Sequence, residues 1–233
     1  MDKSSKLSPV VMPAQAPKST DRPRSRAVEQ TYKPARQKRS AETERRLLNA
    51  AESLFAKRGF DGTKISDIIE KSGCSIGSFY HRFGDKDGLA KVMVDRYLTD
   101  AMATIHDADF SRSHYHDLRS MLAGLSRMVF DFMTARLGVY RAAQHLAHRD
   151  PEIWHDTGYL STLLRDRVCQ FTSEYAGDIS APSAQVAMTN AVQLIVLVIL
   201  QTRLGAGALF PQNDDEFLIM ITDAAMGLLR PQG

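Results

Sequence analysis

The 233-residue chain has only two cysteines, Cys74 and Cys169, and this scarcity excludes a fold held together by a framework of disulfides. The sequence also lacks long apolar runs. Its most apolar stretch covers only residues 194–200, far short of the roughly 20 residues that a membrane-spanning helix needs. No apolar segment follows Lys3 and Lys6, so we expect no secretory signal. These absences predict a soluble, cytoplasmic protein that has no membrane partner.

Lysine is absent after Lys91, and charge is spread unevenly along the chain. Residues 1–39 contain ten Lys/Arg and three Asp/Glu, a net charge of +7, whereas the whole chain has a net charge of +3. The same segment holds five of the nine prolines and shows no helical or strand periodicity. We therefore expect a disordered, basic N-terminal arm over residues 1–39.

Strand-like alternation is also missing, and apolar residues recur at the spacing of amphipathic helices. Ser40 is expected to cap the first helix and Gly59 to end it. The predicted fold class is all-α, with a three-helix domain over 40–86 joined through a long helix to a helical bundle within 87–233. We predict helices over about 40–58, 65–71, 75–83, 86–107, 117–136, 139–148, 151–175, 183–204 and 214–229.

Residues 59–97 suggest a short helix, a glycine turn and a second short helix with an exposed polar face. Phe79 and Phe83 are four residues apart, so both side chains should enter the core of the three-helix domain. Gly77 would allow another backbone to approach closely. This layout is that of a helix-turn-helix, whose second helix lies in the DNA major groove. The side chains left around the outer and end surfaces are those of Ser75, Ile76, Ser78, Tyr80, His81 and Arg82.

Segment 40–90 resembles the N-terminal domain of the tetracycline-repressor (TetR) family of bacterial regulators. The resemblance is carried by AAESLFAKRGFDGT and ISDIIEKSGCSIGSFYHRFGDKDGL, of which SIGSFYHRFGDKDGL is specific to the family. It implies a homodimeric transcriptional regulator, most often a repressor that a small-molecule effector releases from a palindromic double-stranded DNA operator. It implies neither enzymatic activity nor a cofactor. Beyond this segment the chain is similar to the family only in its helical layout.

The resemblance implies DNA contacts from the second helix of the motif and from the start of the next helix. Tyr80 and His81 match positions that contact phosphates and bases. Lys86 matches a phosphate-contacting lysine, and a helix N-terminus already favours a phosphate. Ser75 and Ser78 are expected to bond base edges or phosphates.

Two positions depart from the family pattern. Lys64 stands where a small hydroxyl residue is usual, so the hydroxyl cap is left to Thr63 and Lys64 gains a cationic reach to phosphate. Ile76 stands where a polar or basic residue is common, and it either presses on a thymine methyl or packs inward. Arg82 either contacts DNA or solvates the helix end. The arm over 1–39 either serves solubility alone or contacts phosphates or a minor groove.

Catalytic and metal-binding interpretations are disfavoured. Residues 73–77 spell G-x-S-x-G, the nucleophile elbow of α/β hydrolases, but that motif requires a preceding strand and here follows a predicted helix. His145 and His148, and the histidines and aspartates of 106–116, do not have the spacing of a recognised metal site. We therefore expect no enzyme and no bound metal.

The predicted helices over 117–175 are rich in methionine and aromatic residues, as expected for an apolar pocket with a few polar anchors. Each of these residues either packs in the core or contacts the effector that the resemblance implies. An anionic effector would have to be paired by arginine, for example Arg127 or Arg141. The candidate effector contacts are Met128, Phe132, Tyr140, His145, Trp154, Tyr159 and Gln193.

The predicted helix over 183–204 is apolar almost all round near 191–200, so it must be buried on more than one side. Together with 214–229 it predicts the interface of a homodimer, and the alternative is an internal helix of a monomer. A dimer would set two recognition helices about 34–36 Å apart. A ligand with different affinities for two states could change that separation and release DNA. The alternative function is a helical ligand-binding or scaffold dimer without operator binding.

Overall fold

The computed structural model describes residues 38–149, 151–206, 211 and 213–230, with the backbone alone for 38, 39, 151–157 and 206. The regular structure of these residues is entirely helical, as predicted. The predicted arm, up to residue 37, lies outside the described residues. The helices are α2 (Lys38–Arg58), α3 (Ile65–Ser72), α4 (Ile76–Phe83), α5 (Lys86–Asp107), α6 (Leu118–Ala135), α7 (Leu137–Ala147), α8 (Pro151–Cys169), the 3-10 segment Thr172–Asp178, α9 (Ala184–Gln201), the π segment Thr202–Ala206 and α10 (Asp214–Leu229).

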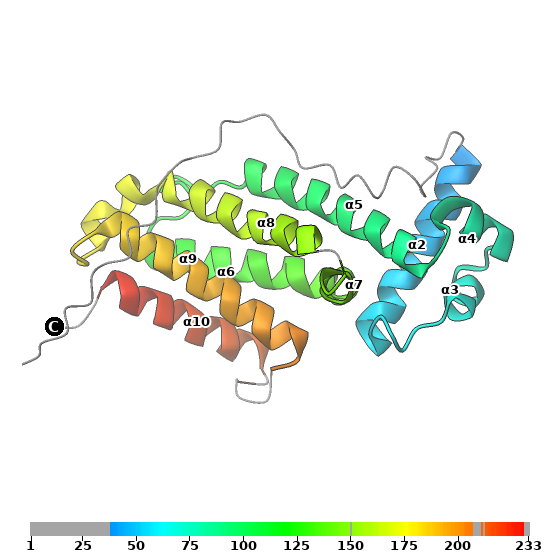
Figure 1. The fold of residues 1–233 in the computed structure, drawn as a ribbon. Helices are drawn as coiled ribbons and strands as arrows, with labels where there is room; N and C mark the ends of the chain where they lie inside the picture. The colour runs from blue at the N-terminus through cyan, green and yellow to red at the C-terminus, as the bar shows by residue number, and fades with distance from the viewer. Residues whose placement is uncertain (1–37, 150, 207–210, 212, 231–233) are drawn as a thin grey trace, which may run out of the picture.

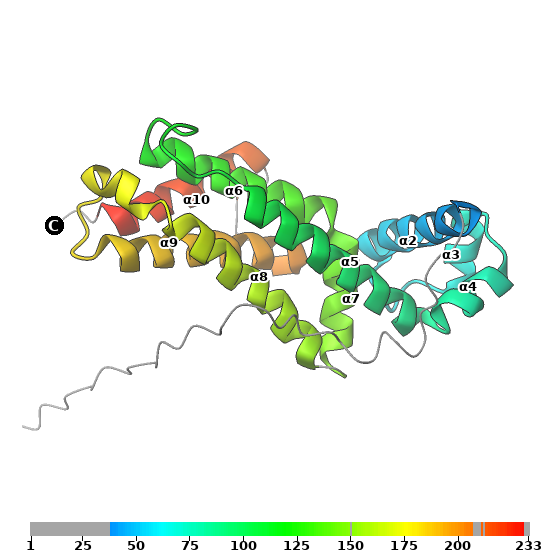
Figure 2. The same ribbon diagram turned by 90° about the horizontal axis from the view of Figure 1, so that it is seen from above.

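Helices α2, α3 and α4 form a small unit at one end of the molecule, and α6 to α10 form an elongated bundle beside it (Figure 1). Helix α5 begins in the small unit and runs along the bundle, so it is shared by both parts (Figure 2). The arrangement confirms the predicted architecture, in which a three-helix unit is joined through a long helix to a helical bundle.

Local sequence signals set several of the helix ends. Gly59 follows α2 with φ +75°, and Gly73 follows α3 with φ +61°, a left-handed backbone that glycine adopts without strain. The Asp85 carboxylate accepts the backbone N–H of Gly88 at 2.6 Å and caps α5, as predicted.

Two predicted caps are wrong. Ser40 is the third residue of α2 and therefore not its cap. The Thr63 hydroxyl does not cap α3, because it donates to the carbonyl of Gly59 at 2.9 Å. The Asp67 carboxylate instead accepts the backbone N–H of Lys64 at 3.1 Å. The carboxylate inside the first turn thus satisfies the N–H of the residue that precedes α3.

The helix predicted over 151–175 is shorter than expected. Helix α8 ends at Cys169, and the chain continues as a 3-10 segment. Tyr175 is fully buried in that segment, and its hydroxyl donates toward the carbonyls of Phe110 at 3.0 Å and Tyr115 at 3.1 Å. These partners lie on the loop between α5 and α6, so a long-range contact replaces the continuation of the helix.

Helix α9 with the residues after it, Ala184–Gly205, is the one segment of the described chain that is long and apolar enough to cross a membrane. A core helix of a soluble protein can have the same length and apolar composition. Here α9 packs against α10, α8 and α6 within the bundle. Packing within the bundle therefore explains only part of its apolar composition, since 33% of its most apolar 18-residue window is buried.

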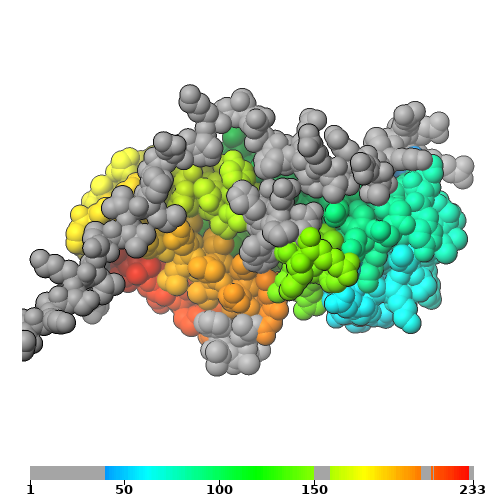
Figure 3. Space-filling view, viewed as in Figure 1, coloured from blue at the N-terminus to red at the C-terminus, as the bar shows by residue number. Residues whose placement is uncertain are grey.

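Helix α7 joins the bundle to the small unit by close backbone contact with α2. A Cβ atom placed on Gly138 would lie 2.1 Å from the carbonyl oxygen of Glu52. The Arg141 guanidinium donates to the carbonyl of Ala56 at 2.5 Å, close to the end of α2. Figure 3 shows the atoms of α7 against those of the small unit.

A second contact closes the same junction. The His145 ring stacks on Phe60 with centroids 4.1 Å apart and planes 24° from parallel, and its Nδ1 lies 3.2 Å from the Asp61 carboxylate. Lys86 Nζ also lies 4.2 Å from the centroid of the Phe60 ring. Phe60, in the loop after α2, thus contacts both α7 and the start of α5, and these contacts hold the small unit on the bundle.

We expect Gly138→Ala to lower the thermal unfolding midpoint, because the added methyl overlaps a backbone atom that no side-chain rotation can move. The expected cost is about 1–3 kcal/mol, as for other overpacked cores. Gly77→Ala is the matched control, since nothing lies within 4 Å of its added Cβ. Thermal melts followed by circular dichroism measure both. Equal midpoints for Gly138→Ala and the native protein would contradict the close α2–α7 contact.

Candidate DNA-binding surface and central cavity

The rotation of α4 is set by two buried phenylalanine rings. Phe79 and Phe83 are fully buried, with centroids 5.5 Å apart. Ser75 caps the helix, because its hydroxyl oxygen accepts the backbone N–H of Ser78 at 3.2 Å. The opposite side of α4 therefore faces outward, as the sequence predicted.

The outward side of α4 carries most of the predicted DNA contacts. Ile76 is 60% exposed and Tyr80 is 49% exposed, so of the two alternatives given for Ile76 the structure contradicts inward packing. Nothing lies within 4 Å of a Cβ added to Gly77, which leaves its backbone open to approach. Ser78 is half-buried. The remaining exposed candidates are Lys64, Ser75 and His81.

The predicted role of Arg82 in the DNA-binding site is corrected by the structure. It is 8% exposed, and its guanidinium donates to the carbonyl of Ser78 at 3.3 Å and to the Ser40 carbonyl and hydroxyl at 3.1 and 2.5 Å. These bonds tie α4 to the first turn of α2. Arg82 therefore neither faces DNA nor solvates the helix end, and its role in this structure is to hold α4 in place.

Lys86 is only partly available for a phosphate. Its ammonium group donates to the carbonyls of Phe60 and Thr63, both at 2.9 Å, and so uses two of its three donors inside the protein. Lys86 thereby connects the start of α5 to the loop between α2 and α3. Its contact with a DNA phosphate stays a prediction.

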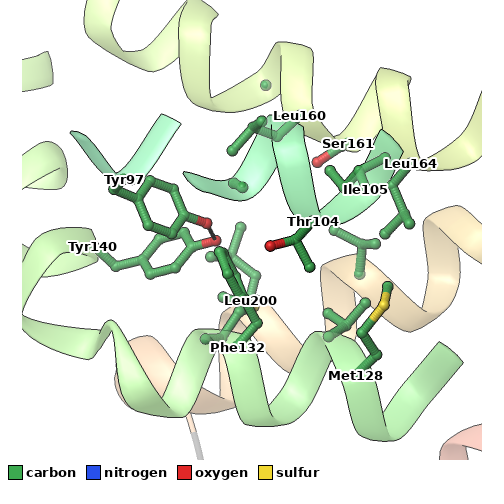
Figure 4. Close-up of a pocket in the computed structure, with 15 residues that line it drawn as sticks. Tyr97, Thr104, Ile105, Met128, Phe132, Tyr140, Leu160, Ser161, Leu164 and Leu200 are labelled. Atoms are coloured by element: carbon green, nitrogen blue, oxygen red, sulfur yellow. Dashed lines mark hydrogen bonds between the residues drawn. The ribbon is translucent and has the colours of Figure 1, made fainter. Parts of the chain in front are cut away.

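A cavity of about 150 Å³ lies in the bundle, among side chains of α5, α6, α7, α8 and α9. Figure 4 shows the Tyr97 and Tyr140 hydroxyls directed toward one another at one end of it. Of the described residues that line it, none is charged, and the polar atoms come from these two tyrosines, Thr104 and Ser161. The cavity therefore suits an uncharged, largely apolar molecule.

The two tyrosines make a short hydrogen bond between their hydroxyls, with ring centroids 5.2 Å apart and planes at 68°. Burial is the main reason that the pKa of each phenol is raised above its ordinary value. Both phenols consequently stay protonated at neutral pH. One hydroxyl proton is used between them, and the other remains to donate to a ligand.

The predicted effector contacts divide into two groups. Met128, Phe132 and Tyr140 line the cavity. His145 does not, because it stacks on Phe60 at the junction with the small unit. Neither Tyr159, which is 43% exposed, nor Gln193, exposed on α9, lines it. The side chain of Trp154 lies outside the described residues.

Neither arginine proposed for an anionic effector lines the cavity. Arg127 pairs with Asp215 at 2.5 Å on the surface, and Arg141 donates to the carbonyl of Ala56. An anion in the cavity would therefore lack a cation among the described lining residues. The residues that the sequence did not single out as effector contacts are Tyr97, Ala101, Thr104, Ile105, Val129, Met133, Gly158, Leu160, Ser161, Leu164, Val196 and Leu200.

The G-x-S-x-G segment forms the turn of the helix-turn-helix. It begins directly after helix α3 and includes the first two residues of α4, and its Ser75 hydroxyl is a helix cap. Among the described residues, no group of three or more His, Cys, Asp or Glu could hold a metal ion.

Comparison with known proteins agrees with this geometry. Residues 47–93 match the family model of bacterial regulatory proteins of the tetR family. The HTH-type transcriptional repressor ComR of Escherichia coli is 34% identical over 61 residues, which are 26% of this chain and 29% of ComR. The match therefore spans less than a third of that repressor. The HTH-type transcriptional regulator UidR of Escherichia coli is 25% identical over 159 residues, 65% of this chain and 76% of UidR.

The fold is shared with solved structures at low sequence identity. A bacterial regulatory protein of the tetR family from Rhodococcus RHA1 superposes with a TM-score of 0.57 and 15% identity, covering 82% of this chain and 98% of its own. A TetR-family transcription regulator from Marinobacter aquaeolei gives 0.52 and 20%, covering 82% and 97%. A helix-turn-helix unit joined to a helical bundle is the architecture of these TetR-family structures. Residues 47–93 are thus similar to the DNA-binding domain of TetR-family bacterial regulators, and the chain shares the fold of such a regulator over 82% of its length.

The chemistry of the cavity predicts which small molecules bind. We expect toluene to raise the thermal unfolding midpoint increasingly with concentration, because a mostly apolar cavity of about 150 Å³ accepts a benzene-sized ligand. Benzoate, of similar shape, should have no effect, since its carboxylate would be buried without a partner.

Ala101→Leu is the matched variant, because it adds three carbon atoms at a buried lining position. It should abolish the response to toluene. A shift of equal size with benzoate, or with toluene in Ala101→Leu, would show that these molecules bind elsewhere.

Proposed function

We propose that this protein is a cytoplasmic homodimeric repressor that binds a palindromic operator and is released by an uncharged small-molecule effector. The observation that carries the proposal is the outward face of α4, with Ile76, Gly77 and Tyr80 exposed on a helix that two buried rings hold in place. The name of ComR as a transcriptional repressor supports the sign of regulation.

Dimerisation is supported by apolar side chains that this chain leaves uncovered. Only 33% of the most apolar 18-residue window of Ala184–Gly205 is buried within the protomer. Leu197 on α9 and Ile219 on α10 are each 56% exposed, and Val186 is 58% exposed. Helices α9 and α10 pack side by side, so their outer faces can join in one surface. A second copy of the chain is the partner that a symmetric regulator requires.

The proposed link between effector and DNA runs through α7. Tyr140 of α7 bonds to Tyr97 of α5 inside the cavity, and the next residue, Arg141, bonds to the Ala56 carbonyl of α2. A ligand that separates the two tyrosines would therefore move α7 against α5. Because α7 is in backbone contact with α2 at Gly138, the small unit would follow. The ligand can shift the equilibrium only as far as it binds the two arrangements differently.

The alternative function is a ligand-binding or scaffold dimer that does not bind an operator. It shares the cavity and the apolar faces of α9 and α10, but it makes no demand on the surface of α4. Substitutions on that surface therefore separate the two functions. A ligand-binding or scaffold dimer would be free of the steric constraint at Gly77 that a DNA groove imposes.

Operator binding is tested by titrating the full-length protein into duplex DNA from its own upstream region and into a random duplex pool, at a stated salt concentration. We expect Gly77→Leu and Tyr80→Ala to reduce affinity at least a hundredfold, since one blocks backbone approach and the other removes a predicted contact. Both variants should keep the native unfolding midpoint, because both sites are exposed. Absence of any enriched sequence with the native protein would favour the scaffold alternative.

The dimer is tested by Leu197→Glu, which places a charge on the exposed apolar face of α9. We expect a monomer by light scattering and loss of operator binding, since a buried unpaired charge is costly at an interface. Ala103→Glu on the exposed side of α5 is the control and should remain dimeric. A Leu197→Glu protein that is still a dimer would place the interface elsewhere.

A further inference from the structure

Large apolar side chains are exposed at seven positions of the described chain, and they fall into two groups. Tyr159, Val186, Leu197, Ile219 and Leu228 belong to α8, α9 and α10. The other two, Ile76 and Tyr80, belong to α4. A dimer through α9 and α10 does not cover the second group, so Ile76 and Tyr80 need a different partner.

Ile76 occupies the first position of α4, directly after the Ser75 cap. It shares its side of the helix with Tyr80, four residues on, while Phe79 and Phe83 face the core. In a helix-turn-helix the residues near the N-terminus of the recognition helix contact base edges. Ile76 is therefore at the end of the helix that approaches the bases.

The polar groups beside Ile76 are already engaged with one another. The Ser75 hydroxyl accepts the backbone N–H of Ser78 at 3.2 Å and donates its proton to the Ser78 hydroxyl at 2.9 Å. Gly77 contributes no side chain. The Ser78 hydroxyl keeps a proton to donate, but it is half-buried. The first turn of α4 therefore presents an apolar branched side chain and one hydroxyl donor.

The major groove offers one apolar group for such a side chain, the 5-methyl of thymine. A phosphate or a base-edge donor or acceptor would lose hydration against Ile76 and gain no bond in return. We propose that Ile76 is a specificity-determining residue that recognises a pyrimidine 5-methyl group in each operator half-site. The inference rests on the proposed function, because it requires α4 to lie in the major groove.

The experiment uses the full-length protein and the duplex enriched from a random pool. Each thymine of the half-site is replaced in turn by deoxyuridine, which removes the methyl and keeps the base pair. We expect one thymine per half-site at which the replacement weakens binding about fourfold, as for one methyl group buried, and both replacements together about fifteenfold.

Ile76→Ala should bind the parent duplex more weakly and should no longer distinguish thymine from uracil at that position. In a double-mutant cycle, removing the side chain and removing the methyl group should therefore be non-additive, as expected for two groups in contact. Cytosine at the same position should be improved by 5-methylation with the native protein and unaffected with Ile76→Ala. His81→Ala is the control, since it should lower affinity and leave the methyl preference unchanged. Ile76 is 60% exposed, so Ile76→Ala should fold normally.

Two results distinguish failure of methyl recognition by Ile76 from failure of the proposed operator binding. If the native protein enriches no duplex, operator binding fails and the inference fails with it. If a duplex is enriched but uracil is tolerated at every thymine, or the uracil penalty is equal in Ile76→Ala, then Ile76 does not recognise a methyl group although the protein binds DNA.

Discussion

The complete burial of two phenylalanine rings on α4 is the constraint on which the rest of the structure depends. Phe79 and Phe83 share one side of a helix of only eight residues, so their burial leaves α4 a single rotation. Ile76, Gly77 and Tyr80 then face outward by geometry alone. Arg82 adds a second restraint, because its bonds to Ser40 hold α4 against the first turn of α2.

Helix α7 provides the proposed link between the cavity and the small unit. Tyr140 and Arg141 are neighbours on α7, and one bonds inside the cavity while the other bonds to the end of α2. The guanidinium also sits where a cation is favoured, beside the negative end of the α2 dipole. A single helix thus contacts both the cavity and the small unit, so no intervening residues are needed to connect them.

The sequence predicted features that depend on neighbours along the chain. The glycine turn, the rotation of α4 and the limits of α5 follow from spacing and caps, and all are observed. Arg82 and His145 were misassigned because their partners, Ser40 and Phe60, lie 42 and 85 residues away along the chain. Nothing in the local pattern distinguishes a surface cation from one that bridges two helices.

The cavity was predictable only in part for a related reason. Met128, Phe132 and Tyr140 were found because methionine and aromatic residues stand out in composition. Ser161 and Leu164 look like any other residues of an amphipathic helix, and only the packing of five helices leaves a space beside them. Gln193 was a candidate effector contact, but it lies on an exposed side of α9.

Hydroxyl-radical footprinting of the full-length protein on its selected duplex tests the central claim most directly, because it measures where two recognition helices meet DNA. The account predicts two protected stretches, related by a dyad, on one face of the duplex and about 10 bp apart or a multiple of that spacing. A single protected stretch, or protection on opposite faces, would contradict the presentation of α4 by a twofold dimer.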